Sequence, residues 1–234
     1  MLSVTLRLAR FFIGLLLLPA CVAATQAVVS LARLAQVASD SIVPPTAWAF
    51  AGGVALWLVV FFTLPRPVRT YVLAHELTHA LWGTLMGEKV LGMSVSAQKG
   101  SVTLSGSNFL ITLAPYFFPL YTVLVIIGYN LLALFYDLND YYLCWLALVG
   151  LTWGFHLTFT LSSLLQRQTD IKECGHLFSY TIIYLFNILG MGLWIVAVSS
   201  PTLEQFIRLI GVDLARLAVL VWKQACFWIG KLGQ

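Results

Sequence analysis

Apolar segments long enough to cross a lipid bilayer recur along this chain, and they constrain its fold more than any other feature. Crossing the hydrocarbon core of about 30 Å takes roughly 20 helical residues. Segments of that length lie near residues 9–31, 46–64, 68–87, 108–135, 141–166 and 176–199. Backbone groups inside a bilayer must be hydrogen-bonded within the chain, so these segments predict about six transmembrane helices.

The charge content excludes an ordinary soluble domain. Only 9% of the 234 residues are charged and 60% are hydrophobic, whereas a soluble domain carries roughly 25% charged residues. The net charge of +4 suits anionic lipid head groups, and no basic run with interleaved aromatic residues suggests nucleic acid. We therefore predict an all-α polytopic membrane protein, with residues 1–234 forming a single integral membrane domain.

The two ends of the chain carry further signals. Arg7 and Arg10 precede the first apolar segment as in a signal peptide, but the apolar run continues to Leu34, so we expect a retained helix. Residues 203–231 are long but carry several charges, which predicts an amphipathic helix that lies on the membrane surface or packs on a partner. The lysine and arginine bias of the loops favours both termini in the cytoplasm, and we expect the inner membrane of a prokaryotic cell.

The motif His75-Glu76-Leu77-Thr78-His79 lies inside the third apolar segment. Residues i and i+4 share one face of a helix, so His75 and His79 can bind one metal ion together. Glu76 lies on a neighbouring face, where it can reach a water molecule activated by the metal. Ionisable groups at membrane depth are costly and usually functional, so this motif predicts a catalytic metal site.

Residues 88–107 change from continuous apolar sequence to alternation. Apolar residues, including Val95 and Val102, alternate with polar ones on both sides of Lys99-Gly100. A period of two around a glycine-containing turn predicts a β-hairpin, although a polar loop is the alternative. We expect the hairpin to present an edge strand to an extended substrate through Val95 and Val102.

A catalytic zinc ion usually takes three protein ligands, and the sequence leaves the third one open. The candidates outside the motif are the histidines, the cysteine and the carboxylates of the later segments, namely His156, His176, Cys174, Asp170, Asp137 and Asp140. Because Asp170 follows the fifth segment, an unbroken helix there would hold it too far from His75. A break near Gly150 or Gly154, or re-entry of residues 167–175, would bring it close.

The chain resembles the site-2 protease family of intramembrane zinc metalloproteases, over about residues 68–190. The resemblance rests on the H-E-x-x-H motif, Gly87 before a strand-like segment, Ala114-Pro115 opening the next span, Gly154-Phe155-His156-Leu157, and Asp170. The family's Asn-x-x-Pro-x-x-Pro-x-Asp-Gly string is absent, so the chain resembles a divergent branch. His156 stands where that string has its asparagine.

This resemblance implies the function and the roles of the site residues. Zinc would be held by His75, His79 and Asp170, with Glu76 as the general base and His156 as a supporting residue beside the ligands. The reaction would be peptide-bond hydrolysis in membrane-embedded protein substrates. Two other functions remain open, a metal-binding transporter and a catalytically silent scaffold, although few polar residues line a transport path and a scaffold has no use for Glu76.

Overall fold

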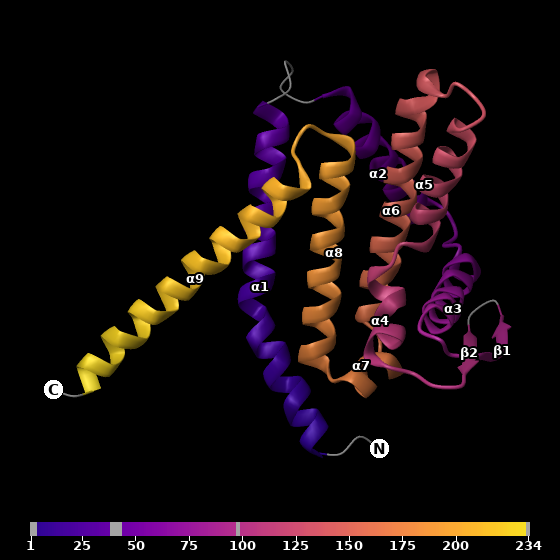
Figure 1. Ribbon diagram of the computed structural model, residues 1–234. Helices are drawn as coiled ribbons and strands as arrows, with labels where there is room; N and C mark the ends of the chain where they lie inside the picture. The colour runs from indigo at the N-terminus through magenta and orange to yellow at the C-terminus, as the bar shows by residue number, and fades with distance from the viewer. Residues whose placement is uncertain (1–3, 38–43, 97–98, 233–234) are drawn as a thin grey trace. The chain divides into compact units, whose positions relative to one another are not determined.

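The computed structural model describes residues 4–37, 44–96 and 99–232, most of which are helical (Figure 1). Their elements are, in order, α1 (Val4–Val37), α2 (Pro45–Thr63), α3 (Val68–Leu85), β1 (Val90–Val95), β2 (Gly100–Leu104), α4 (Phe109–Phe117), α5 (Leu120–Ala133), the 3₁₀ turn η1 (Asn139–Tyr141), α6 (Tyr142–Leu164), α7 (Thr169–Cys174), α8 (His176–Val198) and α9 (Leu203–Leu232). Backbone contacts divide the chain into two compact units. One unit joins residues 1–42 to residues 175–234, and the other comprises residues 43–174.

The predicted number of about six membrane spans is not confirmed. Among the described residues, four helices are long and apolar enough to cross a membrane, namely α1, α2, α6 (with η1) and α8, and the bent pair of α4 and α5 would make a fifth. Helix α3, predicted as a span, is not among them. Its 18 residues include Arg69, the two motif histidines and Glu76, and these polar groups lower its hydropathy.

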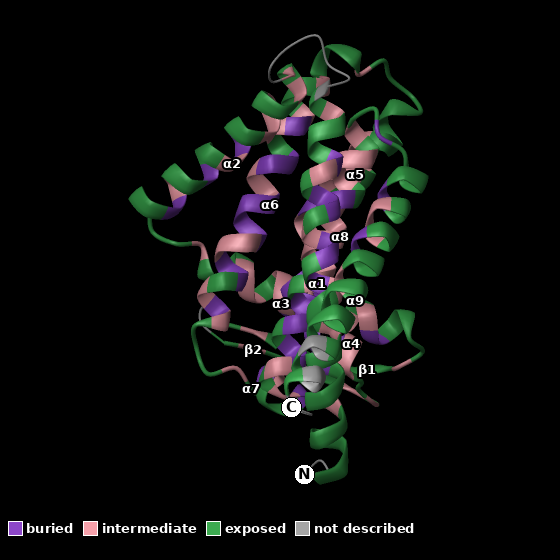
Figure 2. Cartoon of the chain, turned by 90° about the vertical axis from the view of Figure 1, so that its left-hand side faces the viewer, coloured by how far each residue is buried: buried purple, intermediate pink, exposed green. Residues whose placement is uncertain are grey.

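Helices α2 and α6 pack closely in the unit of residues 43–174, and glycine allows the approach. A β-carbon on Gly53 would lie 1.8 Å from the carbonyl oxygen of Ala147, and one on Gly150 would lie 2.1 Å from that of Phe50. Buried residues recur along α6, whereas most of the surface of α2 is exposed (Figure 2). An aromatic cluster continues this contact, formed by Trp57, Phe61, Phe155 and Phe159.

The segment predicted as one span over residues 108–135 is instead broken. Helices α4 and α5 meet at an angle of 73°. Phe118 between them is extended, and Pro119 has no backbone N–H to continue the helical ladder. Helix α4 begins at Phe109, where the Asn108 side chain accepts hydrogen bonds from two backbone N–H groups. Pro115 therefore lies inside α4 and does not open it, contrary to the sequence prediction.

Helix α6 is continuous from Tyr142 to Leu164, so the break considered near Gly150 or Gly154 does not occur. The chain turns after Leu164 instead, and the short helix α7 packs against α4. This turn brings Asp170 toward α3, so Asp170 lies close to His75 although α6 is unbroken.

The predicted β-hairpin is confirmed over β1 and β2. The strands are antiparallel, with Met93 opposite Val102 and Val95 opposite Gly100. Burial alternates along β2, where Gly100, Val102 and Leu104 are partly buried and the residues between them are exposed. Strand β1 shows no such alternation, since Val95 alone is partly buried. Gly100 lies within β2, so the turn comes before this glycine.

In the other unit, α1 and α8 run side by side in the same direction. Gly14 lies against the backbone of Phe178, and the Thr25 and Tyr184 hydroxyls are 2.8 Å apart. The first turns of α9 close this unit, because Phe206 is buried among Ala27, Val28 and Leu31. The predicted C-terminal helix over 203–231 is therefore present, and its place on a membrane surface stays a prediction.

Candidate metal centre

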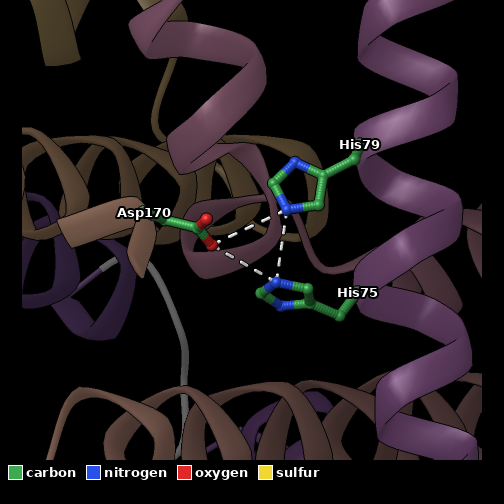
Figure 3. A group of neighbouring side chains, drawn as sticks. All are labelled: His75, His79 and Asp170. Carbon is green, nitrogen blue, oxygen red and sulfur yellow. Dashed lines mark hydrogen bonds and ion pairs between the residues drawn. The ribbon is translucent and has the colours of Figure 1, made fainter. Parts of the chain in front are cut away.

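Helix α3 places His75 and His79 one turn apart, with their rings directed to the same side (Figure 3). Their Nε2 atoms are 3.2 Å apart. The Nδ1 atom of His79 donates a 2.8 Å hydrogen bond to the carbonyl oxygen of Ile111 in α4. A neutral imidazole that donates through Nδ1 presents its Nε2 lone pair, so this bond leaves the His79 Nε2 atom available to a metal ion.

Helix α7 supplies Asp170 to the same point. Its Oδ2 atom lies 3.5 Å from the His75 Nε2 atom and 3.7 Å from the His79 Nε2 atom. Among the described residues, His75, His79 and Asp170 form a group that could hold a metal ion. Their ligand atoms all lie within 4.8 Å of one another. The structure thus brings together the three residues that the sequence analysis named as ligands.

The surroundings keep Asp170 ionised. Burial by itself would raise the pKa of this carboxyl group, but hydrogen bonds with His75, His79 and Tyr116 outweigh burial and hold its pKa below the usual range. The Tyr116 hydroxyl donates one of these bonds to Oδ2 over 2.9 Å. A carboxylate that stays deprotonated is the form that binds metal.

Glu76 is buried on α3 and faces the hairpin. A β-carbon on Gly100 would lie 2.5 Å from Glu76 Cγ and 2.7 Å from Oε1, so a larger residue at this point of β2 would displace the Glu76 side chain. The backbone of Val102 is also within hydrogen-bonding reach of the Glu76 carboxyl group. Strand β2 therefore fixes the position of the Glu76 side chain.

A groove of about 460 Å³ opens beside the metal ligands. Glu76, His79 and Asp170 line one part of it, and the chain from β2 to the start of α4 lines another part through Gly100, Ser101, Val102, Leu104, Gly106, Ser107, Ile111 and Thr112. Val102 thus lies at the groove as predicted. Val95, the other predicted substrate contact, lies on β1 and is not among the lining residues.

The other ligand candidates do not join the three described residues. Cys174 is buried on α7, and His176 is exposed at the start of α8 in the other unit. Asp137 and Asp140 are exposed between α5 and α6. His156 is buried on α6, where it shares with His75 the lining of a cavity of about 20 Å³, enough for about one water molecule.

Two groups at this site were not anticipated from the sequence, the Tyr116 hydroxyl and the Ile111 carbonyl. Tyr116 is fully buried on α4, and its ring packs edge-on against that of His75. A tyrosine in an apolar helix has no sequence signature of its own. The sequence feature that could have drawn attention to Tyr116 is its position directly after Ala114-Pro115.

Comparison with protein-family models, curated proteins and solved structures gives no match for this chain. The case for its function therefore rests on the site itself and on the membrane-length helices of the chain.

Proposed function

We propose that this chain is an intramembrane zinc metalloendopeptidase that hydrolyses peptide bonds of membrane-embedded proteins. The observation that carries the proposal is the convergence of His75, His79 and Asp170 on one point. These side chains come from two helices that are far apart in the sequence, and four candidate spans accompany them. A catalytic metal site among apolar helices is the chemistry that this combination supports best.

The donor set favours zinc. Ligands about 2.0–2.1 Å from a tetrahedral zinc ion lie about 3.3 Å from one another. The three separations here are 3.2, 3.5 and 3.7 Å, close to that value before any adjustment. Two imidazoles and one carboxylate are a common catalytic zinc set, which leaves a fourth position open. When bound, the metal would supply Lewis acidity to the scissile carbonyl.

Glu76 would move the proton in this reaction. Its carboxylate would accept a proton from the attacking water and then deliver it to the nitrogen of the breaking peptide bond, so the amine leaves uncharged. Its position supports this role, because it lines the groove together with His79 and Asp170. Packing against Gly100 restricts its movement.

The substrate would lie along β2 in an extended form. A helical segment hides its amides in internal hydrogen bonds, so it must unwind before attack, and the unwound backbone then needs partners. Strand β2 lies at the groove, whereas β1 pairs with its other side. Pairing along the groove edge of β2 would hold the scissile bond near the ligands.

The purified chain, loaded with zinc in proteoliposomes, tests the proposal against a panel of tagged single-span membrane proteins. We expect cleavage fragments that vanish after chelation and return with zinc. The Glu76→Gln variant should keep stoichiometric zinc and lose activity by about 10²–10⁴-fold, while the exposed Glu204→Gln should match the unaltered chain. Zinc flux across the liposomes that is unaffected by Glu76→Gln, without cleavage, would instead indicate a transporter.

A further inference from the structure

A second polar feature lies in the unit that joins residues 1–42 to residues 175–234. Helices α1 and α9 enclose a groove of about 450 Å³. Its lining mixes polar and apolar side chains, which are Thr25, Gln26, Val29, Ser30 and Arg33 from α1 and Asp213, Arg216, Leu217 and Leu220 from α9. The metal centre belongs to the other unit, and none of its residues lines this groove.

An ion pair between a buried carboxylate and an exposed guanidinium group forms part of one wall of the groove. Only 7% of the Asp213 side chain is exposed, and its Oδ1 atom lies 3.2 Å from the Nη1 atom of Arg216. The Arg216 side chain is itself 74% exposed. A buried carboxylate is costly unless it is paired, and Arg216 supplies the partner here. Asp213 anchors one edge of the guanidinium group, and the remaining donors of Arg216 are left for a ligand.

Arg33 provides a second guanidinium on the opposite wall. It lies one turn before the end of the candidate span Val4–Gln36, and the ends of a transmembrane helix are its parts nearest to lipid head groups. With Arg33 and Arg216 against Asp213, the groove carries one net positive charge. Val29, Leu217 and Leu220 add apolar surface to the same groove.

We propose that this groove binds one anionic phospholipid. The phosphodiester would lie between Arg33 and Arg216, since guanidinium groups bind phosphate oxygens in pairs. One acyl chain would lie along Val29, Leu217 and Leu220. The net positive charge matches the single negative charge of such a head group, and the bound lipid would fasten α9 to α1.

Native mass spectrometry of the full chain in detergent micelles tests this site with two probes. Dioleoylphosphatidylglycerol should be retained as a single molecule. Dioleoylphosphatidylcholine has the same phosphodiester but adds a quaternary ammonium, which a groove of net positive charge disfavours, so it should be retained at least about tenfold less. Equal retention of the two lipids by the unaltered chain would overturn the proposal, and this comparison needs no variant to fold.

Variants then locate the lipid. Arg33→Gln and Arg216→Gln should each lower phosphatidylglycerol retention about tenfold. The matched control is Arg208→Gln on the same helix, which is exposed and does not line the groove. Thermal unfolding in the same micelles shows that each variant is folded. Retention that falls equally in Arg208→Gln, or that persists in both groove variants, would also overturn the proposal.

Discussion

The hydroxyl of Tyr116 donates a 2.9 Å hydrogen bond to Oδ2 of Asp170, the same oxygen that faces both motif histidines. Tyr116 lies on α4 and Asp170 on α7, so this bond joins two helices that pack against each other. It restricts the carboxylate to one orientation. Asp170 can then offer a metal ion one defined oxygen, which is the arrangement that supporting hydrogen bonds commonly provide.

Replacing Tyr116 by Phe should therefore weaken zinc binding by about 10–100-fold, the usual effect of losing a partner that orients a ligand. The ring and its packing on His75 remain, so the fold should persist. Zinc competition against a calibrated chelator measures the change. Tyr129→Phe is the control, because that hydroxyl bonds to the carbonyl of Leu138 away from the ligands. Equal affinities in the two variants would show that the hydroxyl does not orient Asp170.

Zinc content should separate the proposed ligands from the other candidates. His75→Ala, His79→Ala and Asp170→Ala should each lose most of the metal, since each removes one of three ligands. Cys174→Ala and His176→Ala should keep it. Elemental analysis of the purified variants decides between them. Full zinc in Asp170→Ala, together with loss in His156→Ala or His176→Ala, would mean that the third ligand is assigned wrongly.

Gly100→Ala should reduce cleavage and leave zinc in place. The added β-carbon would come within 2.5 Å of Glu76 Cγ and 2.7 Å of Val72 Cγ1, so the Glu76 side chain must shift. A displacement of about 1 Å at a reacting group can lower the rate by about 10²-fold. Turnover and metal content measured on the same sample separate the two effects. Gly92→Ala in β1, which has open space around it, should behave like the unaltered chain.

Proline substitution tests which strand serves the substrate. Val102→Pro removes a backbone donor that lies at the groove and within reach of Glu76, and it should impair cleavage with zinc retained. Val95→Pro changes β1, which does not line the groove, and should have a smaller effect. Cleavage rates of the two zinc-loaded variants give the comparison. If Val95→Pro were the more damaging, the edge of β1 and not that of β2 would be the substrate strand.

Gly53→Ala should destabilise the packing of α2 on α6. Its β-carbon would meet the Ala147 carbonyl at 1.8 Å, so the helices must separate, and such overpacking typically costs about 1–3 kcal/mol. The neighbouring Gly52→Ala is a close control, because nothing lies within 4 Å of its added carbon. Thermal unfolding in micelles should therefore show a lower midpoint for Gly53→Ala only. Matching midpoints would mean that the close approach is dispensable.

The sequence by itself determined the helices and strands that depend on residues close together in the chain. Apolar runs predicted α2, α6 and α8 to within a few residues, because helical residues in a bilayer need only be apolar and long enough. Alternation predicted the hairpin. The spacing of His75 and His79 placed both rings on one side of α3, since helical geometry alone fixes residues i and i+4.

Only the tertiary structure decided how distant segments meet. The bend between α4 and α5 and the turn into α7 bring Asp170 to α3, and no local pattern states where a chain leaving a helix will go. Tyr116 and the Ile111 carbonyl gained their roles in the same way, through contacts across helices. Val102 faces the groove and Val95 does not, because the sheet presents β2 to it. Composition and periodicity report the environment of each residue, whereas the partners of a residue depend on the packing of the whole unit.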